Sequence, residues 1–254
     1  MPGVPPAPRR PSFALLALEV PRAVGEMGLL STVRPLLARA PRGDGHPVLV
    51  LPGFTADDRS TAALRRYLRD LGHAVHGWGL GRNSGPRPEL LAGLQARLDD
   101  LWNRYPDQPM SLVGWSLGGL YAREIARRAP TRVRQVITLG SPFRPVPGQE
   151  SHPSAAIRRM TGRRPPEPRD DGPLPVPSTA VFTRTDGVVP WRSALGEPGP
   201  QAENIEVLSS HCGLGHHPAV LWAVADRLAQ AEGSWAPFEA PRAWAPFFPT
   251  RRIT

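Results

Sequence analysis

Short apolar runs alternate with segments of helical periodicity along most of this chain. The runs predict strands over residues 48–51, 74–78, 110–113, 133–139, 179–183 and 205–208. Between them, apolar residues recur at spacings of three and four, which predicts helices over 58–71, 88–104, 117–128 and 218–230. Strands that alternate with helices form βαβ units, so the pattern predicts an α/β fold with a mostly parallel sheet and helices on both faces.

Three segments depart from this alternation and divide the chain into an N-terminal helical extension (1–45), a core (46–232) and a C-terminal tail (233–254). Apolar residues at helical spacing predict a helix over 12–40. Residues 143–177 are rich in Pro and Arg and interrupt the core between two strands, where we expect a short cap or lid. Prolines and aromatic side chains fill the tail, and we expect those side chains to pack back on the core.

Composition and charge exclude several classes of protein and of binding site. The chain has 254 residues, 40% of them hydrophobic, which suits one large domain. A single cysteine, Cys212, excludes an intramolecular disulfide and a cysteine-cluster metal site. The formal net charge is +9, and all 31 basic residues are arginine. These arginines are scattered in pairs without a nucleic-acid-binding motif, so we expect a solvated basic surface and no nucleic-acid partner.

Targeting signals are weak. Arg9 and Arg10 precede an apolar run of six residues, which Glu19 ends, and no cleavage site with small residues follows. No run is long enough to span a bilayer. We therefore expect a cytoplasmic protein, with peripheral membrane contact left open through the N-terminal helix or the aromatic tail. Packing of that helix on the core is the favoured interpretation, because Glu19 and Glu26 dilute a cationic polar face.

The strongest chemical signal is the sequence Gly-Trp-Ser-Leu-Gly at 114–118, followed by Gly119. It matches the G-x-S-x-G pattern and lies between a predicted strand and a predicted helix, the setting in which this pattern exposes a nucleophilic serine. Small residues two positions to either side of Ser116 are needed because the turn is tight. We therefore predict that Ser116 is a nucleophile.

A serine needs a base, and the base needs a carboxylate that orients it. Asp186 follows the predicted strand 179–183 and is the preferred carboxylate, whereas Asp170 and Asp171 lie in the insert. Three histidines compete as the base, all between the last predicted strand and the last helix: His211, His216 and His217. His211 is favoured, because Pro218 suits the first helical position and places His217 at the N-cap. Cys212 is expected to be a packing residue.

The developing oxyanion needs backbone N–H donors. We expect one from Leu117, directly after the nucleophile, and the other from Phe54, in the Pro-Gly-Phe turn after the first predicted strand. Trp115, Trp78 and Arg82 are weaker candidates for the substrate pocket. No metal-binding pattern is present, so we expect no metal and no cofactor.

These motifs in this order resemble the α/β-hydrolase superfamily, and within it bacterial esterase- and lipase-like enzymes. The residues that carry the resemblance are 46–54, 114–119, 186–190 and 210–215, within a match that covers roughly 46–230. The resemblance implies a Ser116–His211–Asp186 triad that cleaves a small-molecule or lipid ester through an acyl-enzyme. Trp115 stands where many true lipases carry histidine. Two alternatives remain: an acyltransferase or thioesterase with the same triad, and a non-catalytic binding protein on the same fold.

Overall fold

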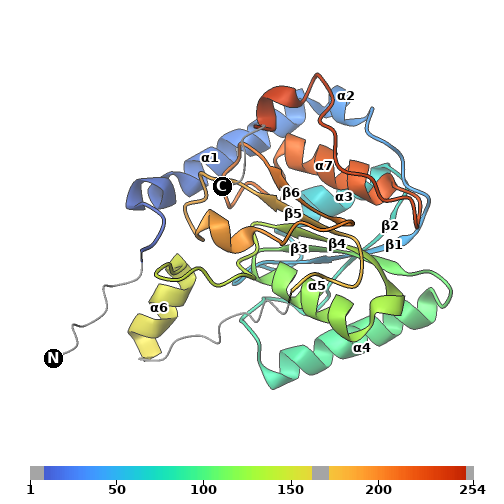
Figure 1. Ribbon diagram of the computed structural model, residues 1–254, viewed down its shortest axis with the longest axis horizontal. Helices are drawn as coiled ribbons and strands as arrows, with labels where there is room; N and C mark the ends of the chain where they lie inside the picture. Colours follow the sequence, from blue (N-terminus) through green and yellow to red (C-terminus); the bar gives the residue numbers. More distant parts are fainter. Residues whose placement is uncertain (1–8, 162–171, 250–254) are drawn as a thin grey trace.

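The computed structural model describes residues 9–161 and 172–249. Six parallel strands form one sheet in the order β2-β1-β3-β4-β5-β6 (Figure 1). The strands are β1 (Pro47–Leu51), β2 (Ala74–Gly77), β3 (Met110–Trp115), β4 (Val133–Leu139), β5 (Ser178–Phe182) and β6 (Ala202–Glu206). The described helices are α1 (Phe13–Thr32), α2 (Arg34–Leu37), α3 (Ala62–Asp70), α4 (Pro88–Arg104), α5 (Leu117–Arg128), α6 (His152–Thr161) and α7 (Pro218–Ala229).

Helices cover both faces of the sheet, as the alternating pattern predicts. Residues of α3 and α7 pack with Val48 and Val50 of β1 on one face, whereas α4 and α5 pack with Leu49 and Leu51 on the other. Figure 1 shows the same two layers, with α7 and α3 on one side of the strands and α4 and α5 on the other. Side chains of a strand alternate between faces, so a five-residue apolar strand buries both of its sides. All five residues of β1 are buried.

The predicted N-terminal helix is divided at Val33 into α1 and α2. Pro35 explains the break, because it lacks the N–H that an unbroken helix would donate to Ser31. Ser12 caps α1, and its side chain accepts a hydrogen bond from Leu15 N. The packing of this helix on the core, predicted from its sequence, is confirmed, but its polar side faces inward, as described below.

Within the core, α3 and β6 are the elements with boundaries that differ from the predictions by three residues or more. Helix α3 begins at Ala62 instead of 58, because the Asp58 carboxylate accepts hydrogen bonds from Trp78 N and Gly79 N at the end of β2. Strand β6 covers 202–206 instead of 205–208, because it pairs residue by residue with β5 from Ala202 onward. The apolar pattern did not predict Glu203 and Asn204 as strand residues, because an edge strand tolerates polar side chains.

The C-terminal tail packs back on the core, as its aromatic residues predict. Trp244 is 1% exposed, and its ring lies 5.5 Å from that of Trp222 on α7. The tail also accepts a hydrogen bond from Leu208 N at Phe247 O. Within the described residues, no helix combines the length and apolarity needed to cross a bilayer.

Candidate active site

Ser116 lies at the junction of β3 and α5, at the carboxyl edge of the sheet. Its backbone adopts φ 52° and ψ −119°, a conformation that is costly for a residue with a side chain. Three glycines make the turn possible: a β-carbon on Gly114 would lie 2.4 Å from Gly119 Cα, and one on Gly118 would lie 2.3 Å from Leu51 O. The serine N–H donates to Leu139 O at 2.8 Å, which ties the turn to β4. The strand–turn–helix setting predicted for this motif is therefore present.

Asp186 and His211 form a buried hydrogen-bonded pair. Nδ1 of His211 lies 2.6 Å from Oδ2 of Asp186. The other carboxylate oxygen, Oδ1, accepts hydrogen bonds from Val188 N and Val189 N, both at 2.8 Å. The loop after β5 thus fixes one oxygen and leaves the second for the imidazole. Asp170 and Asp171, the alternative carboxylates, lie outside the described residues.

The pKa of His211 is raised above its ordinary value. Burial alone lowers this pKa, but the charge of Asp186, the hydrogen bond to Asp186 and the charge of Glu19 together outweigh burial. The other two histidines have different partners: His216 Nε2 lies 2.9 Å from Ala23 O, and the His217 side chain caps α7 by accepting from Ala219 N. Burial lowers the pKa of His217 to about 4. Of the three candidate bases, the structure pairs only His211 with a carboxylate.

Cys212 does not carry a reactive thiolate in this setting. Burial, followed by the negative charge of Glu19, raises the pKa of this thiol to about 12. Nucleophilic cysteines require a lowered pKa. The expectation that Cys212 is a packing residue therefore agrees with its surroundings.

Gly140 and Trp115 hold the His211 side chain and loop from two directions. A β-carbon on Gly140, which has φ +57°, would lie 3.1 Å from His211 Nδ1 and 2.6 Å from Leu214 Cδ1. Trp115 Nε1 donates to His211 O at 3.2 Å. Gly140 directly follows the residue that binds the Ser116 N–H, so the imidazole lies at the end of the neighbouring strand. Among the described residues, Ser116 Oγ makes no hydrogen bond to His211, and in free enzymes such contacts often tighten only when substrate binds.

Asn83 supports the turn that carries Phe54, a role that the sequence did not predict. Its amide donates to Pro52 O at 2.9 Å, and its backbone carbonyl accepts from Thr55 N at 2.7 Å. The side chain is fully buried, and its Oδ1 accepts from Gly85 N. Its burial, which only the structure shows, is what identifies this role.

The Phe54 turn lies against the nucleophile. A β-carbon on Gly53 would lie 3.2 Å from Ser116 Cβ. Within the described residues, the N–H groups of Phe54 and Leu117 donate no hydrogen bond. Leu117 is the first residue of α5, where the helix leaves its N–H groups without internal partners.

The weaker pocket candidates are placed differently. Trp78 is fully buried in the core between α4 and the sheet, and its indole N–H donates to Gly81 O. This placement corrects the expectation of a pocket wall for Trp78, since a side chain with no accessible surface offers none to a ligand. Trp115 is partly exposed and bears on the His211 loop, and Arg82 is exposed.

The inner face of α1 binds the loops that carry Asp186 and His211. Glu19, 2% exposed, accepts from Gly187 N at 2.8 Å and from Cys212 N at 2.9 Å. These two amides directly follow Asp186 and His211 in the chain. The sequence did not predict that Glu19 binds these loops; a carboxylate inside an apolar helix was the signal available.

Arg22 and Glu26 continue this contact along the same face of α1. Arg22 donates to Thr185 O at 2.9 Å and also reaches Ser209 O. Glu26 accepts from Ser210 N at 2.7 Å and from Ser210 Oγ at 2.9 Å. The three charged side chains of α1 thus all bind the two loops of the candidate site.

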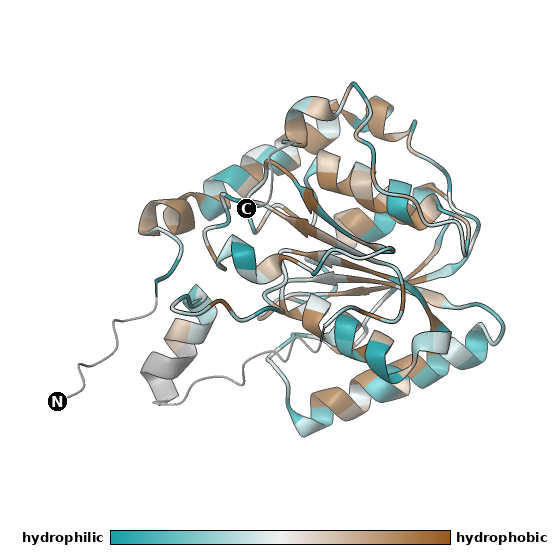
Figure 2. Ribbon diagram, in the orientation of Figure 1, coloured by the Kyte–Doolittle hydropathy of each residue, from teal (hydrophilic) through white to brown (hydrophobic). Residues whose placement is uncertain are grey.

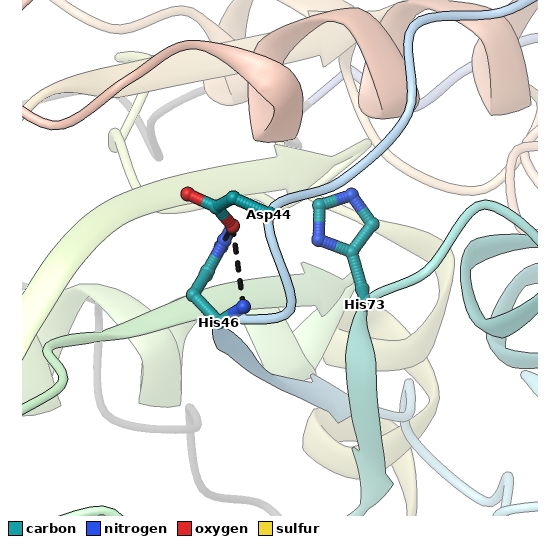
Figure 3. A group of neighbouring side chains, drawn as sticks. All are labelled: Asp44, His46 and His73. Carbon is teal, nitrogen blue, oxygen red and sulfur yellow. Dashed lines mark hydrogen bonds and ion pairs between the residues drawn. The ribbon is translucent and has the colours of Figure 1, made fainter.

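A second chain of Ser, His and Asp lies at the amino ends of the strands, opposite the Ser116 turn: Asp44 and His46 precede β1, and Ser111 is the second residue of β3. His46 Nε2 lies 2.8 Å from Ser111 Oγ, and His46 Nδ1 lies 2.5 Å from Asp44 Oδ1. Figure 3 shows His73 beside this pair. Ser111 is fully buried in β3 and offers no surface to a substrate. The arrangement is therefore structural.

Asp44, His46 and His73 are also close enough to share a metal ion, with ligand atoms within 4.8 Å of one another. Burial lowers the pKa of His73 to about 4, so its imidazole is neutral. However, Asp44 Oδ1 already binds His46, and Asp44 Oδ2 lies 2.7 Å from the Arg134 guanidinium. A cation would have to displace one partner and approach the other's positive charge, so these residues fit a metal poorly.

The fold is that of the α/β-hydrolases. No family model matches the chain. Mouse α/β-hydrolase domain-containing protein 10 superposes with a TM-score of 0.53 at 20% identity, over 74% of this chain and 90% of that one. Naproxen esterase from Bacillus subtilis superposes with a TM-score of 0.52 at 16% identity, over 76% of this chain and 89% of that one. These likenesses show that the chain has the α/β-hydrolase fold.

A sequence relative points to the same class. Pimeloyl-[acyl-carrier protein] methyl ester esterase of Aromatoleum aromaticum is 35% identical over 89 residues, a match that covers 26% of this chain and 35% of that protein. The chain thus matches about a third of the length of this curated relative.

Proposed function

We propose that this protein is a serine hydrolase of lipophilic carboxylic esters, with Ser116 as nucleophile, His211 as base and Asp186 as the carboxylate that orients the base. One observation carries the proposal: Ser116, in a strained turn at the end of β3, donates its N–H to Leu139 O, and the next residue, Gly140, packs against the buried His211, which makes a 2.6 Å hydrogen bond to Asp186. The similarity of part of the chain to a relative named as a methyl ester esterase supports an ester as the bond that is cleaved.

The proposed reaction proceeds in two halves. Ser116 Oγ attacks the ester carbonyl carbon while His211 Nε2 takes the serine proton. Phe54 N–H and Leu117 N–H donate to the oxyanion, and His211 then passes the proton to the departing alcohol. Water attacks the resulting acyl-enzyme with His211 again as base, which releases the acid and restores Ser116.

The raised pKa of His211 suits this role. A base with a higher pKa accepts the serine proton more readily, provided that the pH stays above that pKa. Asp186 stabilises the imidazolium that forms and keeps the proton on Nδ1, so that Nε2 faces the serine.

The test is hydrolysis of p-nitrophenyl esters with acyl chains from C2 to C16, by the parent and by Ser116→Ala. We expect turnover in the parent and a loss of about a thousandfold or more in the variant. A chain-length optimum at medium or long chains supports the lipophilic substrate class. Turnover that survives in Ser116→Ala contradicts the proposed nucleophile.

The same assay separates the two alternatives. Addition of an alcohol or thiol acceptor reveals an acyltransferase if the acyl group passes to the acceptor in preference to water. Labelling of Ser116 by a fluorophosphonate, with no turnover of any ester or thioester, would favour a reaction with a specialised acceptor. A parent that neither turns over nor reacts with the probe would favour a non-catalytic binding protein.

A further inference from the structure

Helix α1 is inverted relative to an ordinary surface helix. Its charged residues Glu19, Arg22 and Glu26 face the protein, whereas apolar side chains on the opposite side of the helix face solvent. The large exposed hydrophobic residues of α1 are Phe13, Leu18, Val20, Val24 and Met27. Elsewhere in the described part of the chain, only Leu91 and Leu208 are comparably exposed.

Four of these five exposed residues, all except Leu18, share one face because of their spacing. Phe13, Val20, Val24 and Met27 follow one another at seven, four and three residues, which places them on one side of a helix. Phe13 is 78% exposed, and Val20 and Val24 are each 67% exposed. Figure 2 shows hydrophobic colouring at the start of α1, on the outside of the molecule and away from α4. A contiguous exposed apolar face of this kind marks an interaction surface.

Charge decides which partner fits this outer face. From residue 9 to residue 43 the only carboxylates are Glu19 and Glu26, and both are turned inward onto the site loops. Exposed arginines flank the helix: Arg9 and Arg10 before it, Arg34 and Arg39 after it. The net charge of the whole chain is +9. An apolar stripe between cationic ends complements the acyl boundary and the phosphates of an anionic bilayer.

We propose that the outer face of α1 docks on an anionic lipid surface, with the helix lying in the plane of the interface. Phe13, Val20, Val24 and Met27 would enter the acyl boundary, and the flanking arginines would bind lipid phosphates. Because the inner face of the same helix holds the Asp186 and His211 loops, docking would place the candidate site beside the membrane. The docking does not depend on catalysis by Ser116.

The test is flotation of the full chain with two kinds of vesicle. One contains phosphatidylcholine alone, and the other contains about 30% of the anionic lipid phosphatidylglycerol, which gives the membrane a negative surface charge. We expect co-flotation with the anionic vesicles, weakened by salt. Val20→Glu combined with Val24→Glu should weaken binding on the order of tenfold or more, because two charges enter the apolar stripe.

The matched control is Leu91→Glu combined with Leu208→Glu, which places the same two charges on exposed leucines outside α1. It should float like the parent. Equal flotation of the double variant and the parent overturns the proposal, as does a parent that fails to float with anionic vesicles. A concentration-dependent dimer, measured by sedimentation and abolished by the double variant, would also overturn it, since the face would then bind a second copy.

A different observation carries a second inference, which rests on the proposed function. We infer that Glu19 is a positioning residue for the Asp186–His211 pair. One buried carboxylate accepts the N–H that follows Asp186 and the N–H that follows His211, and so fixes the separation of the two loops. The fit is tight: a β-carbon on Gly187 would lie 2.5 Å from the backbone of Leu15 on α1.

Glu19 is also one of the charged groups near His211, so a change in the pKa of His211 provides a specific readout of its role. The groups that face this region are Asp186 after β5, Glu19, Arg22 and Glu26 on α1, Cys212 in the same loop, and His216 and His217 before α7. Of the α1 carboxylates, Glu19 and not Glu26 raises the pKa of His211. Removal of the Glu19 charge therefore lowers the pKa of His211.

Glu19→Gln, Glu19→Asp and the matched control Glu26→Gln separate position from charge. Glu19→Gln offers one acceptor oxygen for two N–H groups, so we expect a fall in kcat of about 10- to 100-fold with little change in KM. The acid limb of kcat/KM should move to lower pH. Glu19→Asp, which keeps the charge but is shorter, should lose kcat without moving the limb, and Glu26→Gln should leave the limb in place.

An NMR titration of His211 in Ser116→Ala, with and without Glu19→Gln, gives the same comparison without turnover. A lowered His211 pKa in Glu19→Gln, and not in Glu26→Gln, is the expected result. An unchanged pKa or an unchanged kcat in Glu19→Gln overturns the inference. A parent that cleaves no ester contradicts the proposed function instead, and the titration still decides whether Glu19 acts on His211.

Discussion

His211 Nδ1 and Asp186 Oδ2 lie 2.6 Å apart in a buried setting, and the second oxygen of Asp186 is held by two backbone N–H groups. The carboxylate therefore cannot rotate away from the imidazole without losing hydrogen bonds to its own loop. This geometry predicts how activity depends on pH and on the charge of residue 186.

Activity is expected to rise with pH through the pKa of His211. The base must be neutral to accept the serine proton, and the charge of Asp186 raises its pKa despite burial. The half-maximal point of kcat/KM should therefore lie above the ordinary histidine pKa of about 6.5. A pH profile with a soluble p-nitrophenyl ester measures it. A half-maximal point below that value would contradict the role assigned to the pair.

Asp186→Asn is expected to lower kcat by about ten-thousandfold, because the amide favours the wrong tautomer of His211. Oδ1 still accepts from Val188 N and Val189 N, so the loop should keep its shape. Circular dichroism and the melting temperature serve as the control for folding. A folded variant with nearly full activity would exclude Asp186 as the orienting carboxylate.

Gly140→Ala is expected to impair both folding stability and turnover. Its β-carbon would press on His211 Nδ1 and Leu214 Cδ1, and its φ of +57° costs about 1 kcal/mol for alanine. The matched control is Gly148→Ala, since Gly148 has φ +70° but no atom within 4 Å of an added β-carbon. Both variants should unfold at lower denaturant, but only Gly140→Ala should lose kcat. Equal kcat in the two variants would show that Gly140 does not hold His211.

Asn83→Ala is expected to lower kcat/KM by roughly 100-fold, because the turn that presents Phe54 N–H loses its support. The free energy of unfolding should fall by about 1–3 kcal/mol, since buried backbone groups lose partners. Asn204→Ala is the matched control, because Asn204 binds both backbone groups of Gly196 in another loop. Loss of stability without loss of kcat/KM in Asn83→Ala would argue against its support of the oxyanion turn.

Ser111→Ala is expected to leave kcat/KM unchanged, although Ser111 belongs to a hydrogen-bonded Ser-His-Asp chain. The serine is fully buried, so no ester reaches it, and its bond to His46 contributes about 1 kcal/mol to the free energy of unfolding. Ester hydrolysis and denaturant unfolding check the two parts. A loss of turnover comparable with that of Ser116→Ala would contradict the structural role of this chain.

The sequence by itself determined the strand and helix order, the turn around Ser116, and the loops that carry Asp186 and His211. Local signals suffice there: apolar spacing defines each element, and glycines at 114 and 118 are required wherever the backbone passes so closely. The place of His217 at the N-cap of the last helix also followed, because Pro218 suits the first helical position.

Only the tertiary structure decided which side of α1 faces inward, that Trp78 is a core residue, and that Asn83 and Gly140 bear on the site. Periodicity tells which residues share a face but not which face is buried. On α1 the buried face is the charged one, because the N–H groups after Asp186 and His211 need acceptors away from water. Those partners lie 168 and 193 residues from Glu19, so no local pattern reveals them.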